Sequence, residues 1–558
     1  MPADHPQPQP IPVPPDFPVQ WDSPEEAHLP WSRDPMHFPS PLPALEGELW
    51  GRVMQYGFCR AQEAYQTPIR ARAKQINTYH YDAMVPAVPL EEMEAQGQKA
   101  GEQIGAAIAR LGELWEGEWL PEIKGHLAWW DAYELSGATP AALQTHLDQT
   151  VERMDRLWEL HFRIVLPAYA AMSMFDDLYR DVFGGEGALA SYELLQGFDN
   201  KTLESNRGLW DLSRKARQAP QVREVLEKRA SAEVMGALEQ SAEGRTFLAE
   251  LRAWMEELGQ CGTNWGLTTP TWNEDPAPAL KNIKDYLSQP DGEDPRVQLA
   301  ASATQREEAL AQARAKLQGY PQQVAGQFEF LLKAAQLGVV LSEDHGFWID
   351  FNSMARVRGV LLEVGQRLVR AGFIAAPEEV FHLRLAEVRA ALEAGADCRP
   401  LVAQRQAEIA HFGALTPPPR LGMDYGPPPD NPMTRIFGKL FGGPPPATTE
   451  EGVLKGHAGS AGKAKGRARV IRTLEEAGRL KLGDILVAET TSPPWTPIFA
   501  TAGGIVTDTG GILSHCAVVA REYRITAVVG TGGATKLIRE GQLIEVDGDT
   551  GTVRIVAE

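Results

Sequence analysis

The sequence predicts a multi-domain protein, in which a large, mainly α-helical domain is followed by a small α/β domain. At 558 residues the chain is longer than a single hydrophobic core usually serves. Between residues 45 and 410, apolar residues recur at three- and four-residue spacing over long stretches, as in amphipathic helices. After residue 453 the pattern changes to short apolar runs separated by glycine turns, which is typical of strands alternating with helices.

The N-terminal residues 1–30 are expected to form a proline-rich, extended arm. The first 18 residues lack a basic segment followed by an apolar core, so they do not resemble a signal peptide. Residues 31–414 are then predicted to form the helical domain, which is large enough for two lobes. Its helical patterns cover residues 90–130, 140–181, 202–217, 221–258 and 295–341, and strand signals are almost missing.

A second proline-rich segment, residues 415–452, is expected to be a semi-rigid linker. Residues 453–558 follow as the α/β domain, and residues 543–556 have the pattern of a β-hairpin. A linker of this kind would let the last domain move between two positions while it stays tethered.

The composition indicates a globular protein of the cytoplasm. A formal net charge of −20 argues against nucleic acid and anionic membranes as partners. No apolar run is expected to span a bilayer. The four cysteines lie far apart without the spacing of metal ligands, so we expect reduced thiols and no bound metal.

The most informative residue is His515. An apolar run at residues 503–506 predicts a strand, Gly510 and Gly511 allow a tight turn, and residues 516–523 predict a helix. The histidine would therefore lie at a helix N-terminus, where the dipole and free amide groups favour a phosphate; we expect this phosphate site at Thr509, Gly510, Gly511 and Ser514. Imidazole is a good nucleophile near neutral pH, which predicts a phosphohistidine, although a structural histidine at such a corner is the alternative.

The surrounding motifs resemble the phosphohistidine swivelling domain of the family that includes phosphoenolpyruvate synthase and pyruvate phosphate dikinase. The resemblance covers residues 453–558 and is carried by residues 459–470, 483–488, 491–497, 507–521 and 527–530. Leu513-Ser514-His515 and Arg521-Glu522-Tyr523 are more similar to rifampin phosphotransferase and phenylphosphate synthase. Cys516 and the stretch 524–526 depart from the usual pattern, which weakens the loop match but leaves the chemistry unchanged.

Parts of the helical domain resemble the substrate domain of the same branch. These parts are residues 31–34, 37–39, 41–42, 194–198, 272–276, 341–350 and 379–381, and residues 259–262 depart from the pattern. The resemblance implies an acceptor site with a general base and a cationic clamp. We consider His345 first for the base, with His80 and Glu343 as alternatives, and Arg356 and Arg358 for the clamp. His80, Glu343, Trp348 and Asp350 are the candidates for substrate binding.

The resemblance further implies that ATP is the phosphoryl donor. No nucleotide site is recognisable in this sequence, since Ala464 follows Gly462-Lys463 where a phosphate-binding loop requires Ser or Thr. We therefore expect a separate, ATP-grasp-like subunit that holds ATP and Mg²⁺, with no cofactor held permanently by this chain. The expected reaction passes a phosphoryl group through His515 to a small, phenolic hydroxyl. The alternatives are a natural-product or antibiotic phosphotransferase component and a non-catalytic phosphocarrier in signalling.

Overall fold

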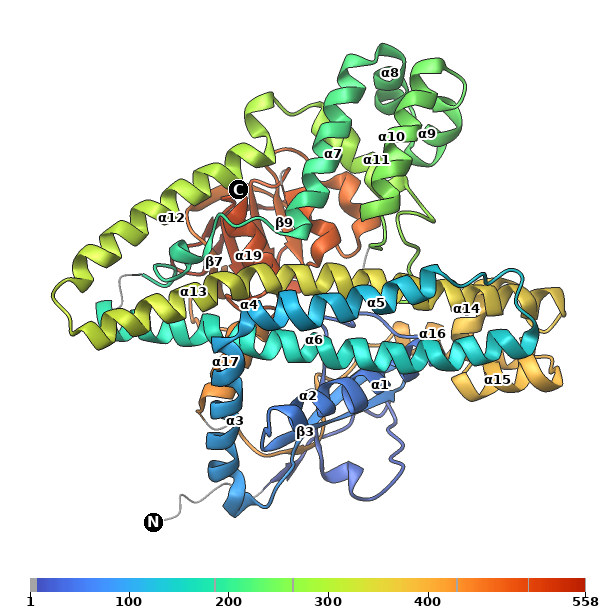
Figure 1. Cartoon of the computed structure of the whole chain (residues 1–558), viewed down its shortest axis with the longest axis horizontal. Helices are drawn as coiled ribbons and strands as arrows, with labels where there is room; N and C mark the ends of the chain where they lie inside the picture. The colour runs from blue at the N-terminus through green and yellow to red at the C-terminus, as the bar shows by residue number, and fades with distance from the viewer. Residues whose placement is uncertain (1–7, 185–186, 263–264, 428–429, 500, 557–558) are drawn as a thin grey trace. The chain divides into compact units, whose positions relative to one another are not determined.

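The computed structural model describes residues 8–184, 187–262, 265–427, 430–499 and 501–556. The chain divides into two compact units. Unit 1 consists of Met1–Leu166, Trp265–Thr268 and Trp348–Asp430, and unit 2 of Pro167–Asn264, Thr269–Phe347 and Asn431–Glu558. The predicted fold class, mainly helical with a C-terminal α/β domain, is confirmed (Figure 1).

Unit 1 contains a five-stranded antiparallel sheet that the sequence pattern did not reveal. Its order is β1-β5-β2-β4-β3, formed by β1 (Gln9–Pro10), β2 (Pro30–Arg33), β3 (Ile69–Ile76), β4 (Tyr79–Pro86) and β5 (Arg420–Asp424). The expectation that strand signals are almost missing between about residues 45 and 410 therefore overlooked β3 and β4. β3 alternates apolar and polar residues from Ile69 to Lys74, but two of the apolar residues are small alanines, so its strand signal is weak.

The two proline-rich segments also differ from plain spacers, because each contributes a strand to this sheet. β1 lies in the expected N-terminal arm and β5 in the expected linker, and they pair with each other. Proline is tolerated there because β1 is an edge strand. The linker also contains helix α17 (Pro432–Phe441), whose first turn is capped by the side chain of Asn431.

The helices of unit 1 lie between and around these strands in the sequence. They are α1 (Ala44–Arg52), α2 (Cys59–Ala64), α3 (Met93–Ala109), α4 (Leu111–Leu114), α5 (Leu120–Asp131), α14 (Asn352–Arg370), α15 (Leu385–Ala394) and α16 (Arg399–Gly413). Short π-helical segments occur at Val53–Phe58, Trp115–Trp119 and Gly346–Phe351. The long helix α6 (Pro140–Phe183) crosses from unit 1 to unit 2 at Pro167.

The helices of unit 2 form two apolar clusters. The first is built by α7 (Lys201–Gln218), α8 (Pro220–Lys228), α9 (Ser231–Leu238), α10 (Ala242–Leu258) and α11 (Ala277–Leu287). The second joins the end of α6 with α12 (Pro295–Leu317) and α13 (Gln322–His345). Leu513 and Val518 of the C-terminal domain belong to this second cluster, so the domain packs directly on these helices (Figure 1).

The C-terminal domain is built on an eight-stranded sheet of order β6-β13-β12-β8-β9-β10-β11-β7. Its strands are β6 (Val453–Lys455), β7 (His457–Ser460), β8 (Lys463–Val470), β9 (Ile485–Ala488), β10 (Gly504–Thr507), β11 (Ala527–Val529), β12 (Leu543–Asp547) and β13 (Thr552–Ile555). Strands β8 to β11 are parallel, and the predicted C-terminal hairpin is β12–β13. The domain's helices are α18 (Thr496–Phe499), α19 (His515–Glu522) and α20 (Ala534–Leu537).

One described helical run, Gln322–Arg370, is long and apolar enough to cross a membrane by length and composition. This differs from the expectation that no such run exists. A core helix meets the same criterion, and 44% of the most apolar window is buried within the protein. Five acidic residues also lie in this run, namely Glu329, Glu343, Asp344, Asp350 and Glu363.

Candidate functional site

His515 is the first residue of α19, directly after the glycine loop that follows β10. Gly510 has φ +98°, which a residue with a Cβ rarely adopts, so the glycine is needed for the turn. Ser514, with extended backbone angles, takes the N-cap position. The strand, turn and helix predicted from the sequence therefore present the imidazole at a helix N-terminus.

The His515 imidazole lies between two oxygen atoms of unit 2. Nδ1 is 3.2 Å from Oε1 of Glu343, and Nε2 is 3.3 Å from Oγ1 of Thr496. Because an ionised carboxylate only accepts, Nδ1 carries the proton and donates it to Glu343, while the Thr496 hydroxyl donates to Nε2. This tautomer leaves the electron pair on Nε2, which is the atom able to attack phosphorus.

Glu343 is held firmly. Its second oxygen, Oε2, accepts a 2.9 Å hydrogen bond from the hydroxyl of Thr202 at the start of α7. The side chains of Glu343 and His515 are only 3% and 11% exposed, so their interaction is largely shielded from water. The neighbouring Asp344 accepts from the Lys201 amide, and burial raises its pKa to about 6.

The backbone of the predicted phosphate loop is already hydrogen-bonded in this structure. The amides of Thr509, Gly510, Gly511 and Ser514 donate to the carbonyls of Glu489, Phe441, Leu440 and Gly511, respectively. In this arrangement these four residues therefore offer no free amide to a phosphate. Helix α17 accounts for two of the four, because its carbonyls at Phe441 and Leu440 accept from Gly510 and Gly511. The Ser514 hydroxyl is buried with no partner among the described residues, so it can still bind a phosphoryl oxygen.

Helix α17 is itself anchored to α6. The Lys439 ammonium lies 2.8 Å from Asp176 and 2.8 Å from Asp177, and it also donates to the Ser173 carbonyl at 3.2 Å. Asp176 is buried; burial would raise its pKa, but Lys439, Ser191 and Arg180 lower it overall. The linker helix is thus fixed through a side chain to α6 and through its backbone to the glycine loop.

Of the remaining candidates, His345 belongs to unit 2 with Glu343. Its Nδ1 donates to the Leu341 carbonyl of its own helix at 2.6 Å, so Nε2 is the nitrogen that would act as a base. The other five candidates lie in unit 1. Arg356 forms an ion pair with Asp131, Arg358 donates to the Leu267 carbonyl, and the Lys124 ammonium lies 4.9 Å from the Trp348 ring.

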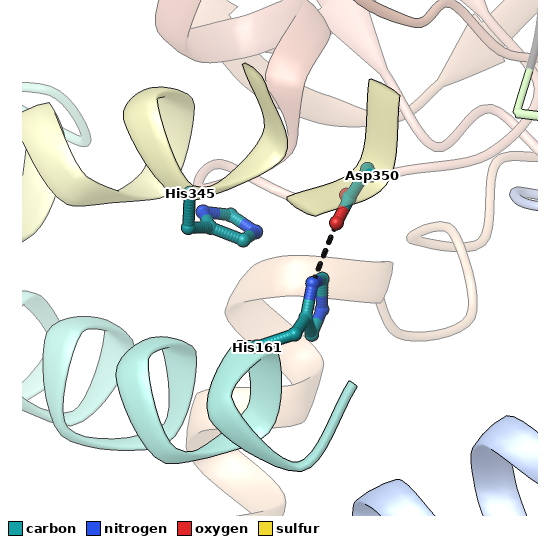
Figure 2. Close-up of side chains that lie close together, drawn as sticks. All are labelled: His161, His345 and Asp350. Atoms are coloured by element: carbon teal, nitrogen blue, oxygen red, sulfur yellow. Dashed lines mark hydrogen bonds and ion pairs between the residues drawn. The ribbon is translucent and has the colours of Figure 1, made fainter. Parts of the chain in front are cut away.

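His80 and Asp350 lie in two of three histidine–aspartate pairs of unit 1, here termed the histidine–aspartate cluster. His80 Nε2 is 3.0 Å from Asp82, His37 Nδ1 is 2.6 Å from Asp34, and His161 Nδ1 is 2.7 Å from Asp350. Figure 2 shows the last pair, with Asp350 in the π-helical segment and His161 on α6; His345, also drawn, ends α13 in unit 2.

The charges in this cluster reinforce one another. Burial alone would lower the pKa of His80 and of His37, but the aspartates beside them raise both overall. Burial likewise opposes ionisation of Asp34, yet His37 brings the pKa of Asp34 down to about 2. Nδ1 of His80 is buried and has no hydrogen-bond partner among the described residues, so a ligand hydroxyl could occupy that position.

Aromatic rings surround the same residues. Phe38 lies 4.7 Å from the His80 ring and 5.0 Å from the Trp50 ring, and the His37 ring is 5.0 Å from that of Trp265. Trp158 connects Trp50 with His161, at 4.9 and 4.5 Å between ring centres. Such a mixture of rings and hydrogen-bonding imidazoles suits an aromatic ligand that carries a hydroxyl.

Several of these residues were not singled out by sequence reasoning. Asp82 and His80 are two residues apart on β4, so their side chains share a face of the sheet, and Asp34 and His37 are three apart in a turn. This local spacing was a sequence signal that could have revealed the two pairs. No such signal exists for Thr202, Thr496 and His161, because their partners are far away in sequence.

Two protein families match the chain. Residues 161–343 match the rifampicin phosphotransferase fourth domain, and residues 480–551 match the mobile domain of PEP-utilising enzymes. Glu343 and His515, the hydrogen-bonded pair, therefore lie one in each matched region.

Several curated proteins align over longer stretches. Chondramide synthase of Chondromyces crocatus is 38% identical over 98% of this chain and 14% of its own length. An uncharacterised phosphotransferase of Bacillus subtilis is 31% identical over 72% of this chain and 47% of its own length. Rifampicin phosphotransferase of Streptomyces sviceus is 29% identical, over 71% of this chain and 44% of its own length. The chain thus spans less than half the length of these relatives. These matches show that the chain carries a rifampicin phosphotransferase-type domain ahead of a mobile domain of the PEP-utilising type.

Proposed function

We propose that the protein is a phosphotransferase that carries a phosphoryl group on Nε2 of His515 and passes it to a hydroxyl of a small, phenolic acceptor. The donor is ATP, held with Mg²⁺ by a nucleotide-binding, ATP-grasp-like partner, and the reaction takes place in the cytoplasm. The observation that carries the proposal is the position of His515 at the N-terminus of α19, with Nδ1 donating to Glu343.

The loading half of the reaction uses this hydrogen bond. In loading, the Nε2 electron pair attacks phosphorus, the bond from phosphorus to the donor oxygen breaks, and the imidazole becomes positively charged. The Glu343 carboxylate stabilises that charge through the Nδ1 proton. In transfer, the acceptor oxygen attacks phosphorus, the P–Nε2 bond breaks, and a general base takes the hydroxyl proton.

We propose that the acceptor ring binds at the histidine–aspartate cluster of unit 1. The rings of Phe38 and Trp265 offer an apolar surface, and the unpartnered Nδ1 of His80 offers an acceptor for the hydroxyl proton. Asp82 would orient His80 through Nε2, as an orienting carboxylate does for a catalytic histidine. Glu343 and His345 of unit 2 are the alternative bases.

The experiment loads the intact protein with phosphoramidate, a small phosphoryl donor that needs no partner protein. We expect an acid-labile, base-stable phosphate on the wild type, followed by formation of phenyl phosphate when phenol is added, both measured by ³¹P NMR. His515→Asn should fold normally, as judged by circular dichroism, and should show neither signal. A phosphate that persists on the variant would exclude His515 as the carrier.

A second acceptor class is supported by a specific observation. Chondramide synthase, which aligns with 98% of this chain, and rifampicin phosphotransferase both have names that point to natural products. The phosphorylated protein should therefore also be offered rifampicin and other hydroxylated natural products in place of phenol. Faster transfer to one of these compounds than to phenol would reassign the acceptor while it leaves the role of His515 unchanged.

A further inference from the structure

The phosphohistidine helix ends in three residues, Arg521, Glu522 and Tyr523, whose side chains lie against the helical part of unit 2. The Arg521 guanidinium lies 5.0 Å from the centre of the Tyr192 ring. The Tyr523 hydroxyl accepts a 2.9 Å hydrogen bond from Asn206 of α7. The proposed transfer chemistry assigns no role to these three residues.

Glu522 makes the most specific of these contacts. It is 4% exposed, and both of its carboxylate oxygens lie within hydrogen-bond distance of the Gly197 amide, at 3.0 and 2.9 Å. A carboxylate seldom becomes so buried without a partner that balances its desolvation. Among the described residues, the hydrogen-bond donor to this carboxylate is the backbone N–H group of Gly197.

The segment 196–198 is shaped to present that amide. Gly197 has φ +76°, and a Cβ at this position would lie 2.4 Å from the backbone nitrogen of Ala303. Arg306 donates to the carbonyls of Gln196 and Gly197 at 3.0 and 2.8 Å, and its guanidinium lies 4.0 Å from the centre of the Phe198 ring. The loop is thus held by α12 independently of Glu522.

We propose that Glu522 and the segment 196–198 form a docking contact that holds the mobile domain where His515 meets Glu343. Glu522 is a positioning residue, since it touches neither the phosphoryl group nor the acceptor. The inference rests on the proposed function in one respect, namely that a phosphohistidine carrier must leave one station to reach another. The inference adds the residues that define one of the positions of the mobile domain.

The contact also makes docking sensitive to pH. Burial raises the pKa of Glu522 to about 7, against the opposing effects of the Gly197 amide, Arg521 and Arg306, while the charge of Glu343 adds to the increase. Once released into water, the carboxyl returns to an ordinary pKa, so docking takes up a proton. The favourable contribution is fully present below the ordinary carboxyl pKa and is lost as the pH rises through about 7.

Hydrogen–deuterium exchange of the full-length protein tests the contact directly, through the amide of Gly197. In Glu522→Ala the protection factor of Gly197 should fall about tenfold or more, because its hydrogen-bond partner is gone. The matched control Glu545→Ala removes an exposed glutamate of the same domain and should leave Gly197 protected. Unchanged protection in Glu522→Ala would overturn the docking contact.

The pH dependence has its own variant. Between pH 6 and pH 8 the protection factor of Gly197, which is corrected for intrinsic exchange, should fall in the wild type. Glu522→Gln keeps the size and one acceptor oxygen but cannot ionise, so its protection factor should stay constant over the same range. If the wild-type dependence persists in Glu522→Gln, another group titrates and the assignment to Glu522 is wrong.

A kinetic measurement connects the contact with the carrier. Because Glu343 stabilises the imidazole charge that forms in loading, loading of His515 by phosphoramidate should slow about tenfold in Glu522→Ala, while transfer from the preloaded protein to phenol should be unchanged. Equal slowing of both steps would indicate a structural role and overturn the positioning role. Failure of the wild type to phosphorylate phenol would count against the proposed acceptor alone, because exchange at Gly197 reports docking without any transfer.

Discussion

Both units of the molecule bury a histidine beside a carboxylate, but they build the pair in opposite ways. In unit 1, His80 and Asp82 are two residues apart on one strand, so the pair exists wherever the strand does. In unit 2, His515 meets Glu343 across 172 residues of chain, and the two come from different domains. A pair within one strand is permanent, whereas a pair between two domains can be broken and formed again. The first arrangement suits a substrate site and the second a carrier.

Removing the charge of Glu343 from its pair with His515 should have the largest effect on the reaction rate. Glu343→Gln keeps the shape but loses the charge that stabilises the positively charged imidazole. We expect loading of His515 by phosphoramidate to slow about a hundredfold, because loading is the step in which this charge forms. The rate at which the phosphohistidine signal appears in ³¹P NMR measures this step alone. Thr202→Val, which removes only the hydrogen bond to the other oxygen of Glu343, is the graded control and should lose much less. If Glu343→Gln is loaded as fast as the wild type, the contact serves docking and not chemistry.

Removing the charge of Asp82 from its pair with His80 should affect only the transfer step of the reaction. Asp82→Asn leaves His80 in place but withdraws the charge that orients it and raises its pKa. We expect phosphoramidate to load His515 normally and transfer to phenol to slow about tenfold. The pH at which transfer is half-maximal should also shift downward, because a base with a lower pKa is deprotonated at lower pH. A loss of loading in this variant would show that the cluster supports the fold and not the acceptor.

The smallest effect concerns stability, and it contrasts the pH responses of the two units. The pKa of Asp34 is lowered from 3.8 to about 2, so its stabilisation is present above the ordinary value and is lost as the pH falls through about 2. At one pKa unit per 1.4 kcal/mol, this amounts to about 2 kcal/mol at most. Thermal unfolding of the wild type and of Asp34→Asn between pH 2 and pH 6 measures the difference. The two curves should converge at the acid end, and a constant gap would mean that ionisation of Asp34 does not contribute.

Local sequence patterns predicted the parts of the molecule that are locally determined. The corner at Gly510 and His515, the helix after it and the β12–β13 hairpin each follow from residues adjacent in sequence. The sheet of unit 1 was missed because β5 pairs with β2 and β1 from nearly four hundred residues away, inside a proline-rich stretch. Proline content predicted a spacer there, and edge-strand pairing changed the outcome.

The candidate sites show the same limit. Glu343 and His515 were both named from the sequence, but nothing in it indicates that the two side chains meet. His80 was named for its aromatic neighbours, whereas its partner Asp82 was overlooked although the spacing was visible. Free amides were expected at the glycine loop. Two of these amides bond to α17, which lies in a segment whose composition indicated only a linker.

The hydrogen bonds from the glycine loop to α17 have a mechanical consequence. Because the end of this helix closes the loop beside His515, the helix and the loop would move together, and the ion pairs of Lys439 with Asp176 and Asp177 would break when they do. The pivot then lies before Asn431, where the chain passes from unit 1 to unit 2, and not in the prolines after Phe441. The reach of the imidazole is accordingly set by the length of chain ahead of the helix. Extra residues between α17 and β6 would leave the distance that His515 can travel nearly unchanged, whereas the same insertion ahead of Asn431 would increase that distance.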